Sequence, residues 1–160
     1  MAIGILKERF KGENRVALTP DVIKKLLTKT SIYVETGAGL KAGFPDHLYS
    51  EAGAHVVDSL ENVFQNIDIL ISVNRFGDNV KDISDVMKFA SPQTIYMGTI
   101  GAQSYQEQWE VYQKQQLSVY ALEMIPRISR AQSMDVLSSQ ANLAGYRAVI
   151  EAVYEYGRAM

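Results

Sequence analysis

Short runs of β-branched and aromatic residues alternate with helical patterns along this chain. We expect strands at residues 3–6, 32–35, 55–57, 67–73, 94–99 and 117–122. This alternation is typical of βαβ units, in which the strands lie parallel within one sheet. The pattern therefore predicts an α/β protein and argues against an all-helical bundle or a β-sandwich.

Several segments between the expected strands carry helix start signals. Thr19 places a capping hydroxyl before Pro20 at a first helical position, and apolar residues follow at helical spacing. Asp58 with Glu61 has the spacing of a capping box, as does Ser104 with Glu107. The second box predicts a helix whose aromatic face is more typical of a core than of a binding site, namely Tyr105, Trp109 and Tyr112.

The last part of the chain, residues 136–160, has a long helical pattern that would extend about 37 Å at 1.5 Å per residue. Gly157 could cap its end. Small residues recur along it, and we expect another domain or subunit to pack there: Ala141, Ala144, Gly145, Ala148 and Ala152. The complete prediction is an open, mostly parallel Rossmann-like or flavodoxin-like sheet flanked by helices and ending in a long helix.

Composition narrows the possible functions. The 160 residues suit one soluble domain, and a formal net charge of -2 gives no electrostatic footprint for nucleic acid. The absence of cysteine excludes disulfides and thiol catalysis, and two histidines argue against a metal site. We find no apolar run near the roughly 20 residues of a membrane helix. We expect a cytoplasmic protein whose partners are small molecules or proteins.

A glycine-rich segment, residues 35–46, follows an expected strand and raises the possibility of a dinucleotide fingerprint. In that fingerprint a helix opens directly on the glycines, so that its N-terminal amides meet the pyrophosphate. Here Pro45 and Asp46 intervene, which leaves Gly37, Gly39 and Gly43 in a loop. We therefore favour a structural turn over a phosphate cradle.

Charged residues follow the first expected strand, at the sheet edge where open α/β proteins bind ligands. They are Lys7, Glu8, Arg9 and Arg15. Spacing alone favours a solvated charged loop over a site. His47 and His55 have no acidic or serine partner at useful spacing, and we interpret both as structural.

The stretch "PRISRAQSMD" bunches polar residues before the long helix. If a helix begins near residue 129 or 130, then Arg127 and Arg130, and Gln132 and Asp135, cluster on a short arc. Guanidinium, carboxylate and amide groups match the phosphate, ribose and carboxamide of a dinucleotide. An Arg127 to Asp135 salt bridge with serine caps explains the same residues equally well.

Four motifs resemble the amino-terminal domain shared by alanine dehydrogenases and proton-translocating NAD(P) transhydrogenases. They are "GILKERFKGENRVALTP", "ETGAGLKAGF", "AGAHVVDS" and "PRISRAQSMDVLSSQANLAGYRAVIEA". The last is similar to the transhydrogenase alpha subunit in particular. The likeness runs along nearly the whole chain.

The resemblance implies an oxidoreductase that transfers hydride between NADH and NADP+, coupled to proton translocation in the full complex. It implies that Arg127, Gln132, Asp135 and Ser138 bind NAD(H), with Gln132 near the ribose and nicotinamide as an orienting group and not as an acid or base. NADP(H) would lie on a partner domain or subunit. The protein would then contribute positioning of two nicotinamide rings.

The sequence departs from the alanine dehydrogenase branch at two positions. The resemblance assigns keto-acid binding in that branch to an arginine, matched by Arg15, and to a lysine and a histidine. Those last two positions hold Asn74 and Thr99. An alanine dehydrogenase activity is therefore disfavoured. A non-catalytic binding or regulatory module of the same fold stays open as an alternative.

The resemblance also implies parts that these residues do not contain. In the family a Rossmann domain that binds the NAD pyrophosphate follows, and NADP-binding and membrane components complete the complex. We expect residues 1–160 to be a truncated amino-terminal domain, inactive alone and able to form a homodimer. It would be cytoplasmic, not inserted in the membrane itself, and peripheral to the inner membrane through the complex.

Overall fold

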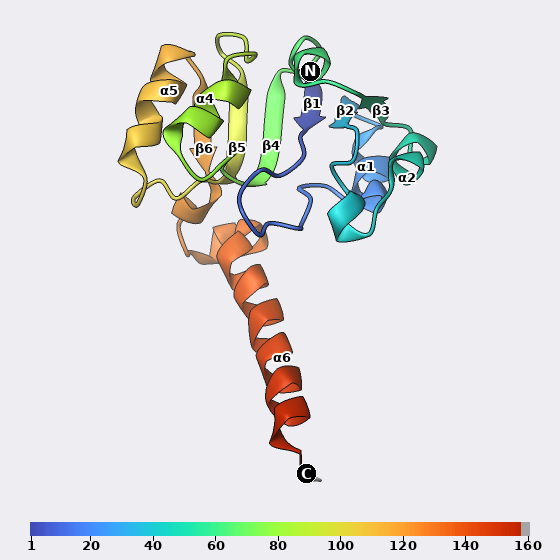
Figure 1. Ribbon diagram of the computed structural model, residues 1–160, viewed down its shortest axis with the longest axis vertical. Coiled ribbons are helices and arrows are strands. Elements are labelled where there is room, and N and C mark those ends of the chain that lie inside the picture. The colour runs from blue at the N-terminus through green and yellow to red at the C-terminus, as the bar shows by residue number, and fades with distance from the viewer. Residues whose placement is uncertain (158–160) are drawn as a thin grey trace. The chain divides into compact units, whose positions relative to one another are not determined.

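The computed structural model describes residues 1–157, which form two compact units. The first unit, Met1–Ala121, contains a sheet of six parallel strands (Figure 1). The strands are β1 (Ala2–Ile5), β2 (Ser31–Glu35), β3 (His55–Val57), β4 (Ile69–Asn74), β5 (Ile95–Thr99) and β6 (Ser118–Ala121). All six expected strands are confirmed, with their ends displaced by at most two residues.

The strand order is β3-β2-β1-β4-β5-β6. The chain winds outward in one direction from β1 to β3 and in the other from β4 to β6, so the order reverses between β1 and β4. This is the order of a Rossmann-like sheet, and such sheets bind ligands beyond the carboxyl ends of the strands at the reversal. The predicted fold class is confirmed.

Helices cover both faces of the sheet because alternate strand residues point to opposite sides. In β4, Ile69 and Ile71 pack with the core on one face of the sheet, whereas Leu70 packs with the core on the other face. The helices are α1 (Pro20–Leu26), α2 (Asp46–Glu51), α3 (Leu60–Phe64), α4 (Val80–Met87) and α5 (Trp109–Lys114). Short 3-10 turns add η1 (Leu40–Ala42) and η2 (Gln106–Gln108).

The structure confirms only some of the predicted helix starts. The α1 helix begins at Pro20 as predicted, although the Thr19 side chain makes no capping hydrogen bond. In α3 the cap is Ser59, whose Oγ accepts the Asn62 N–H at 3.2 Å, so the predicted Asp58 to Glu61 box is wrong by one residue.

The second predicted capping box, Ser104 with Glu107, is also wrong. The N-cap residue of η2 is Tyr105, without a side-chain bond, and the α-helix starts only at Trp109. Trp109 and Tyr112 do share a packed face, with ring centroids 5.7 Å apart, and Tyr112 is buried. Tyr105 lies outside the helix, and its ring packs against a guanidinium group instead.

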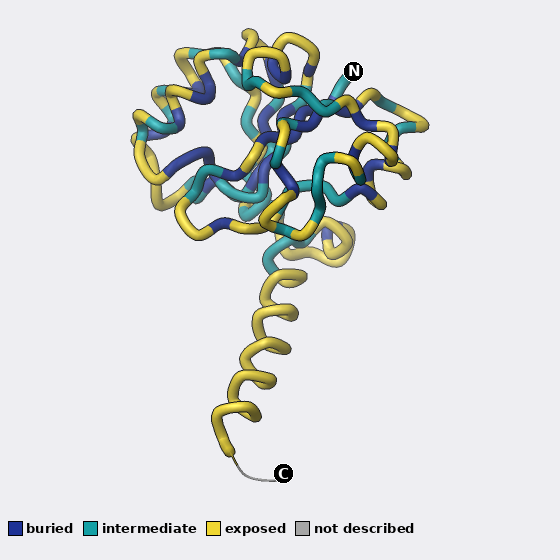
Figure 2. Tube along the Cα trace, turned by 45° about the vertical axis from the view of Figure 1, so that its right-hand side comes forward, coloured by how far each residue is buried: buried dark blue, intermediate teal, exposed yellow. Residues whose placement is uncertain are grey.

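The second unit, from Leu122 onward, holds two short 3-10 helices and one long α-helix. These are η3 (Leu122–Met124), η4 (Ser129–Met134) and α6 (Val136–Tyr156). Gly157 caps α6 in the left-handed conformation, with φ of 62°, as predicted; residues 158–160 of the expected helix lie outside the described residues. From residue 138 to 156, α6 is exposed in Figure 2.

Candidate functional site

The predicted polar cluster gathers around one hollow in the second unit. Arg127, Gln132, Asp135 and Ser138 line it together with Ile128 and Ser129, and its volume is about 330 Å³. Ile128 has extended backbone, and the η4 turn that follows it brings Gln132 and Asp135 back toward Arg127. Arg130, which we expected in the cluster, does not line this hollow.

Asp135 is fixed by the start of α6. Its Oδ1 accepts the Ser138 N–H at 3.0 Å, and its Oδ2 accepts the Ser138 hydroxyl at 2.6 Å. These two bonds, helped by the charge of Arg127, hold the pKa of Asp135 below its ordinary value. The carboxylate is therefore ionised and oriented, and it caps the helix at the same time.

The salt-bridge interpretation of the cluster is not supported by this geometry. Across residues 1–157, the ion pairs within 4.0 Å do not include one between Arg127 and Asp135. The Arg127 and Gln132 side chains are exposed, and they offer a guanidinium fork and an amide to a ligand. The cap of α6 comes from Asp135, with Ser138 as the donor and not the acceptor.

The chemistry of this hollow is that of binding and orientation. It presents one fixed carboxylate, one guanidinium and one amide, which together suit hydroxyl, phosphate or carboxamide groups. Among the residues that the structure describes, no group of three or more histidine, cysteine, aspartate or glutamate side chains could hold a metal ion.

A second polar cluster lies at the carboxyl edge of the sheet, where the strand order reverses. Glu8 is 6% exposed and its two oxygens accept the N–H groups of Val73 at 2.6 Å and Asn74 at 3.1 Å. Glu13 is 8% exposed and binds Arg15 through two side-chain bonds of 2.8 and 2.7 Å. The prediction of a solvated charged loop is therefore wrong for Glu8, which backbone donors hold. Glu13, which the prediction did not name, is held by a guanidinium in the same loop.

Arg75 is a buried residue that the sequence pattern did not indicate. It is 5% exposed, and its Nε donates to the carbonyl of Gly77 at 3.1 Å. Its guanidinium lies 3.4 Å from the ring centroid of Tyr105 and 4.8 Å from that of Phe10. Arg75 thus connects the loops that follow β1, β4 and β5. In the sequence this contact was indicated only by the aromatic residues Phe10 and Tyr105 in two of those loops.

The two positions that depart from the alanine dehydrogenase pattern come together in the sheet. Asn74 ends β4 and Thr99 ends β5, and the two residues are register partners. Both therefore lie at the carboxyl edge of the sheet, but one is an amide and the other a hydroxyl. This edge has no lysine or histidine at these positions to hold a carboxylate.

The glycine-rich segment forms the structural turn that we favoured. Gly37 and Gly43 have φ of 75° and 86°, and the short η1 turn lies between them. The α2 helix begins only after Pro45, and its Asp46 accepts the Gly37 N–H at 2.8 Å. That amide is bonded within the protein.

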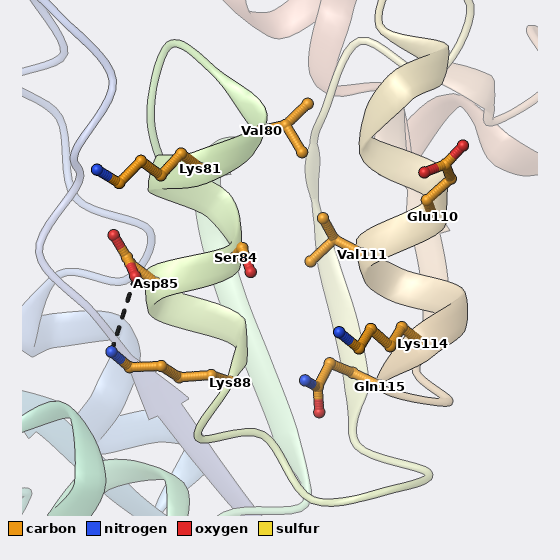
Figure 3. Close-up of a pocket in the computed structure, with 9 residues that line it drawn as sticks. All are labelled: Val80, Lys81, Ser84, Asp85, Lys88, Glu110, Val111, Lys114 and Gln115. Atoms are coloured by element: carbon orange, nitrogen blue, oxygen red, sulfur yellow. Dashed lines mark ion pairs between the residues drawn. The ribbon is translucent and has the colours of Figure 1, made fainter.

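A further hollow of about 630 Å³ lies between α4 and α5 (Figure 3). Lysines from both helices surround it, and Lys88 pairs with Asp85 at 3.7 Å. The apolar residues Val80 and Val111 come from facing sides of the two helices. These are exposed lysines in open geometry, unlike the fixed groups around Asp135.

The strand order defines the first unit as a Rossmann-like α/β domain, and comparison with known proteins identifies the family. The profile of the alanine dehydrogenase/PNT N-terminal domain matches residues 4–144. The chain therefore belongs to that family. Within the described residues, no helix is both long and apolar enough to cross a membrane.

The individual relatives point to one branch. NAD(P) transhydrogenase subunit alpha of Cereibacter sphaeroides is 42% identical over 159 residues, which are 99% of this chain and 29% of that protein. The crystal structure of transhydrogenase from Sinorhizobium meliloti matches with a TM-score of 0.88 and 37% identity, over 99% of this chain and 46% of that one.

The likeness to the sister branch is shorter. Alanine dehydrogenase of Bacillus subtilis is 43% identical over 65 residues, 40% of this chain and 17% of that protein. A solved L-alanine dehydrogenase has a TM-score of 0.69 and 25% identity over 78% of this chain and 33% of that one. The chain spans less than half the length of each of these relatives.

Proposed function

We propose that this chain is part of the NAD(H)-binding component of a proton-translocating NAD(P) transhydrogenase. One observation carries the proposal: Arg127, Gln132, Asp135 and Ser138 line a single hollow, in a chain that resembles transhydrogenase alpha subunits over 99% of its length. Asn74 and Thr99 disfavour the amino-acid dehydrogenase activity of the sister branch.

In this proposal the hollow receives the nicotinamide and ribose end of NADH. The ionised Asp135 would accept hydrogen bonds from ribose hydroxyls, and Arg127 would donate to ribose or phosphate oxygens. The Gln132 amide can both accept and donate, so it suits the carboxamide or a ribose hydroxyl. None of these groups needs to move a proton, and their work is to fix the distance and angle at which hydride passes to NADP+.

The remainder of the site belongs, in this proposal, to parts outside these residues. A Rossmann domain would cradle the pyrophosphate, and NADP-binding and membrane components would supply the hydride acceptor and the proton path. The chain alone would then be inactive. In the complete protein the chain would lie on the cytoplasmic side of the inner membrane. The partner domain would pack along α6, next to the hollow at the start of that helix.

The substitution Gln132→Asn tests this role in the complete protein. It keeps the amide and withdraws it by one methylene, so we expect the rate of hydride transfer to fall more than NADH binding weakens. Single-turnover kinetics with NADH and NADP+ measure the first quantity, and a fluorescence titration of NADH measures the second. Gln113→Asn, on the exposed side of α5, is the matched control. Equal losses in rate and binding, or no change in rate, would contradict the proposed orienting role.

A further inference from the structure

The sheet edge where the strand order reverses contains a buried carboxyl group that the proposed function does not use. Glu8 comes from the loop after β1, and its oxygens accept the backbone N–H groups of Val73 and Asn74 at the end of β4. The β4 and β5 register shifts between Ile71 and Asn74, so β4 departs from regular pairing at this point. Glu8 thus binds two backbone N–H groups at the irregular end of β4.

Asn74 is held on several sides. Its N–H donates to Glu8 at 3.1 Å, and its carbonyl accepts the Tyr96 hydroxyl at 3.4 Å. Its side-chain Oδ1 accepts the N–H of Arg75 at 3.0 Å. A change at Glu8 therefore acts on the residue that connects β4 to the buried Arg75.

The charged groups that act on Glu8 come from its own loop. Glu13 opposes its ionised form and Arg15 favours it, while β4 faces it with the amide groups of Val73 and Asn74. Arg9, next in the chain, is engaged by Glu35 at 2.6 Å. The two backbone amides stabilise the ionised carboxylate more than the charge of Arg15 does.

We propose that Glu8 is a proton-responsive strap that fixes the carboxyl end of β4 to the loop after β1. The ionised carboxylate accepts both N–H groups. The neutral acid has one carbonyl oxygen that accepts well and one hydroxyl that is itself a donor, so it keeps one of the two bonds. Proton uptake therefore loosens Asn74, and the loss of that proton tightens it.

The pH at which the strap changes lies near neutrality. Burial raises the pKa of Glu8 to about 7, against the opposing effect of the two backbone hydrogen bonds. Protonation of Glu8 would therefore change the hydrogen bonding at Val73 and Asn74 within the physiological pH range.

Nuclear magnetic resonance on the complete chain tests the strap. We expect the backbone amide signals of Val73 and Asn74, and the Glu8 side-chain carboxyl carbon, to titrate together with a midpoint near pH 7. Glu13→Gln should lower that midpoint, because it removes a neighbouring negative charge and releases Arg15. Glu51→Gln, an exposed glutamate of α2, is the matched control and should leave it unchanged.

The variant Glu8→Gln makes the test sharper. Its amide has one acceptor oxygen and one donor nitrogen, so it imitates the protonated acid. At pH 8 the Val73 and Asn74 signals of this variant should match the low-pH positions of the wild type and should no longer titrate. A Glu8 carbon in the wild type that titrates near 4.5, or Val73 and Asn74 amides that do not follow it, would overturn the proposal whether or not the variant folds.

Discussion

Side-chain oxygens accept backbone N–H groups at many places in the described residues, and three of these places lie at the ends of helices or strands that matter here. Ser59 caps α3, Asp135 caps α6, and Glu8 binds the end of β4. Each uses an acceptor to satisfy an amide that has no partner in the regular pattern of its element. These oxygens fix where helices and strands end, and Asp135 does so within the candidate site.

The cap of α3 gives the first prediction. Ser59→Ala should lower the free energy of unfolding by about 1 kcal/mol, because the Asn62 N–H loses its acceptor. Asp58→Ala should cost less than half of that, since the Asp58 carboxylate accepts a hydrogen bond from an exposed side-chain amide, that of Asn62, and not from a helix N–H group. Urea unfolding followed by circular dichroism measures both. A larger loss from Asp58→Ala would restore the capping box that the sequence suggested.

The burial of Glu8 gives a prediction on stability and pH. Its pKa is raised from 4.5 to about 7 in the folded state, so the folded protein binds the proton more tightly than the unfolded chain. The contribution of Glu8 to stability is therefore fully present below pH 4.5 and is lost as the pH rises through 7.

The expected loss is on the order of 3 kcal/mol between those limits. Glu8→Gln should remove most of this dependence of the unfolding free energy on pH. The variant should therefore be more stable relative to the wild type at pH 8 than at pH 5. Urea unfolding of both proteins at about those two pH values provides the comparison. A difference that is constant with pH would mean that Glu8 has an ordinary pKa in the folded protein.

At the scale of elements, the sequence predicted the strands better than the helix starts. Apolar runs mark buried parallel strands clearly, and all six were found. The α4 helix was missed because its first turn lies in the polar stretch 74–82, where Asn79 provides the cap. The capping box predicted at Ser104 does not form. The Tyr105 ring packs against the Arg75 guanidinium instead, a contact that the local sequence spacing does not predict.

The long helix α6 gives a prediction at this scale. Gly145 lies in its middle, and an added Cβ would have no heavy atom within 4 Å. Gly145→Ala should therefore stabilise α6 in this chain by about 1 kcal/mol, measured as a higher midpoint of helix melting by circular dichroism. Ser139→Ala, at the first turn, serves as a comparison. A lower midpoint for Gly145→Ala would show that the glycine is already in close contact with another backbone.

The row of small residues along α6, from Ala141 to Ala152, still predicts that a partner domain or subunit packs there. Large apolar side chains are also exposed on the same helix, including Leu143 at 61%, Tyr146 at 70% and Val149 at 63%. A helix that is apolar over much of its surface is normally covered in the working protein. This agrees with the proposal that another domain packs along α6.

At the scale of the whole molecule, the sequence could assign the fold but only some of the candidate site. Local spacing brought Arg127, Gln132 and Asp135 to one arc because they lie within nine residues of one another. The cluster of Glu8, Glu13 and Asn74 could not be found in that way, because its members are brought together by the pairing of β1 with β4. Contacts set by sheet topology need the structure.

The central claim is that residues 127–138 face the nicotinamide end of NADH in a transhydrogenase. The most direct test is a crystal structure of the complete protein with NADH bound. We predict that the nicotinamide and its ribose lie within hydrogen-bonding distance of Arg127, Gln132 and Asp135, with the pyrophosphate held by residues outside this chain. A dinucleotide whose nicotinamide and ribose make no contact with this hollow would contradict the claim.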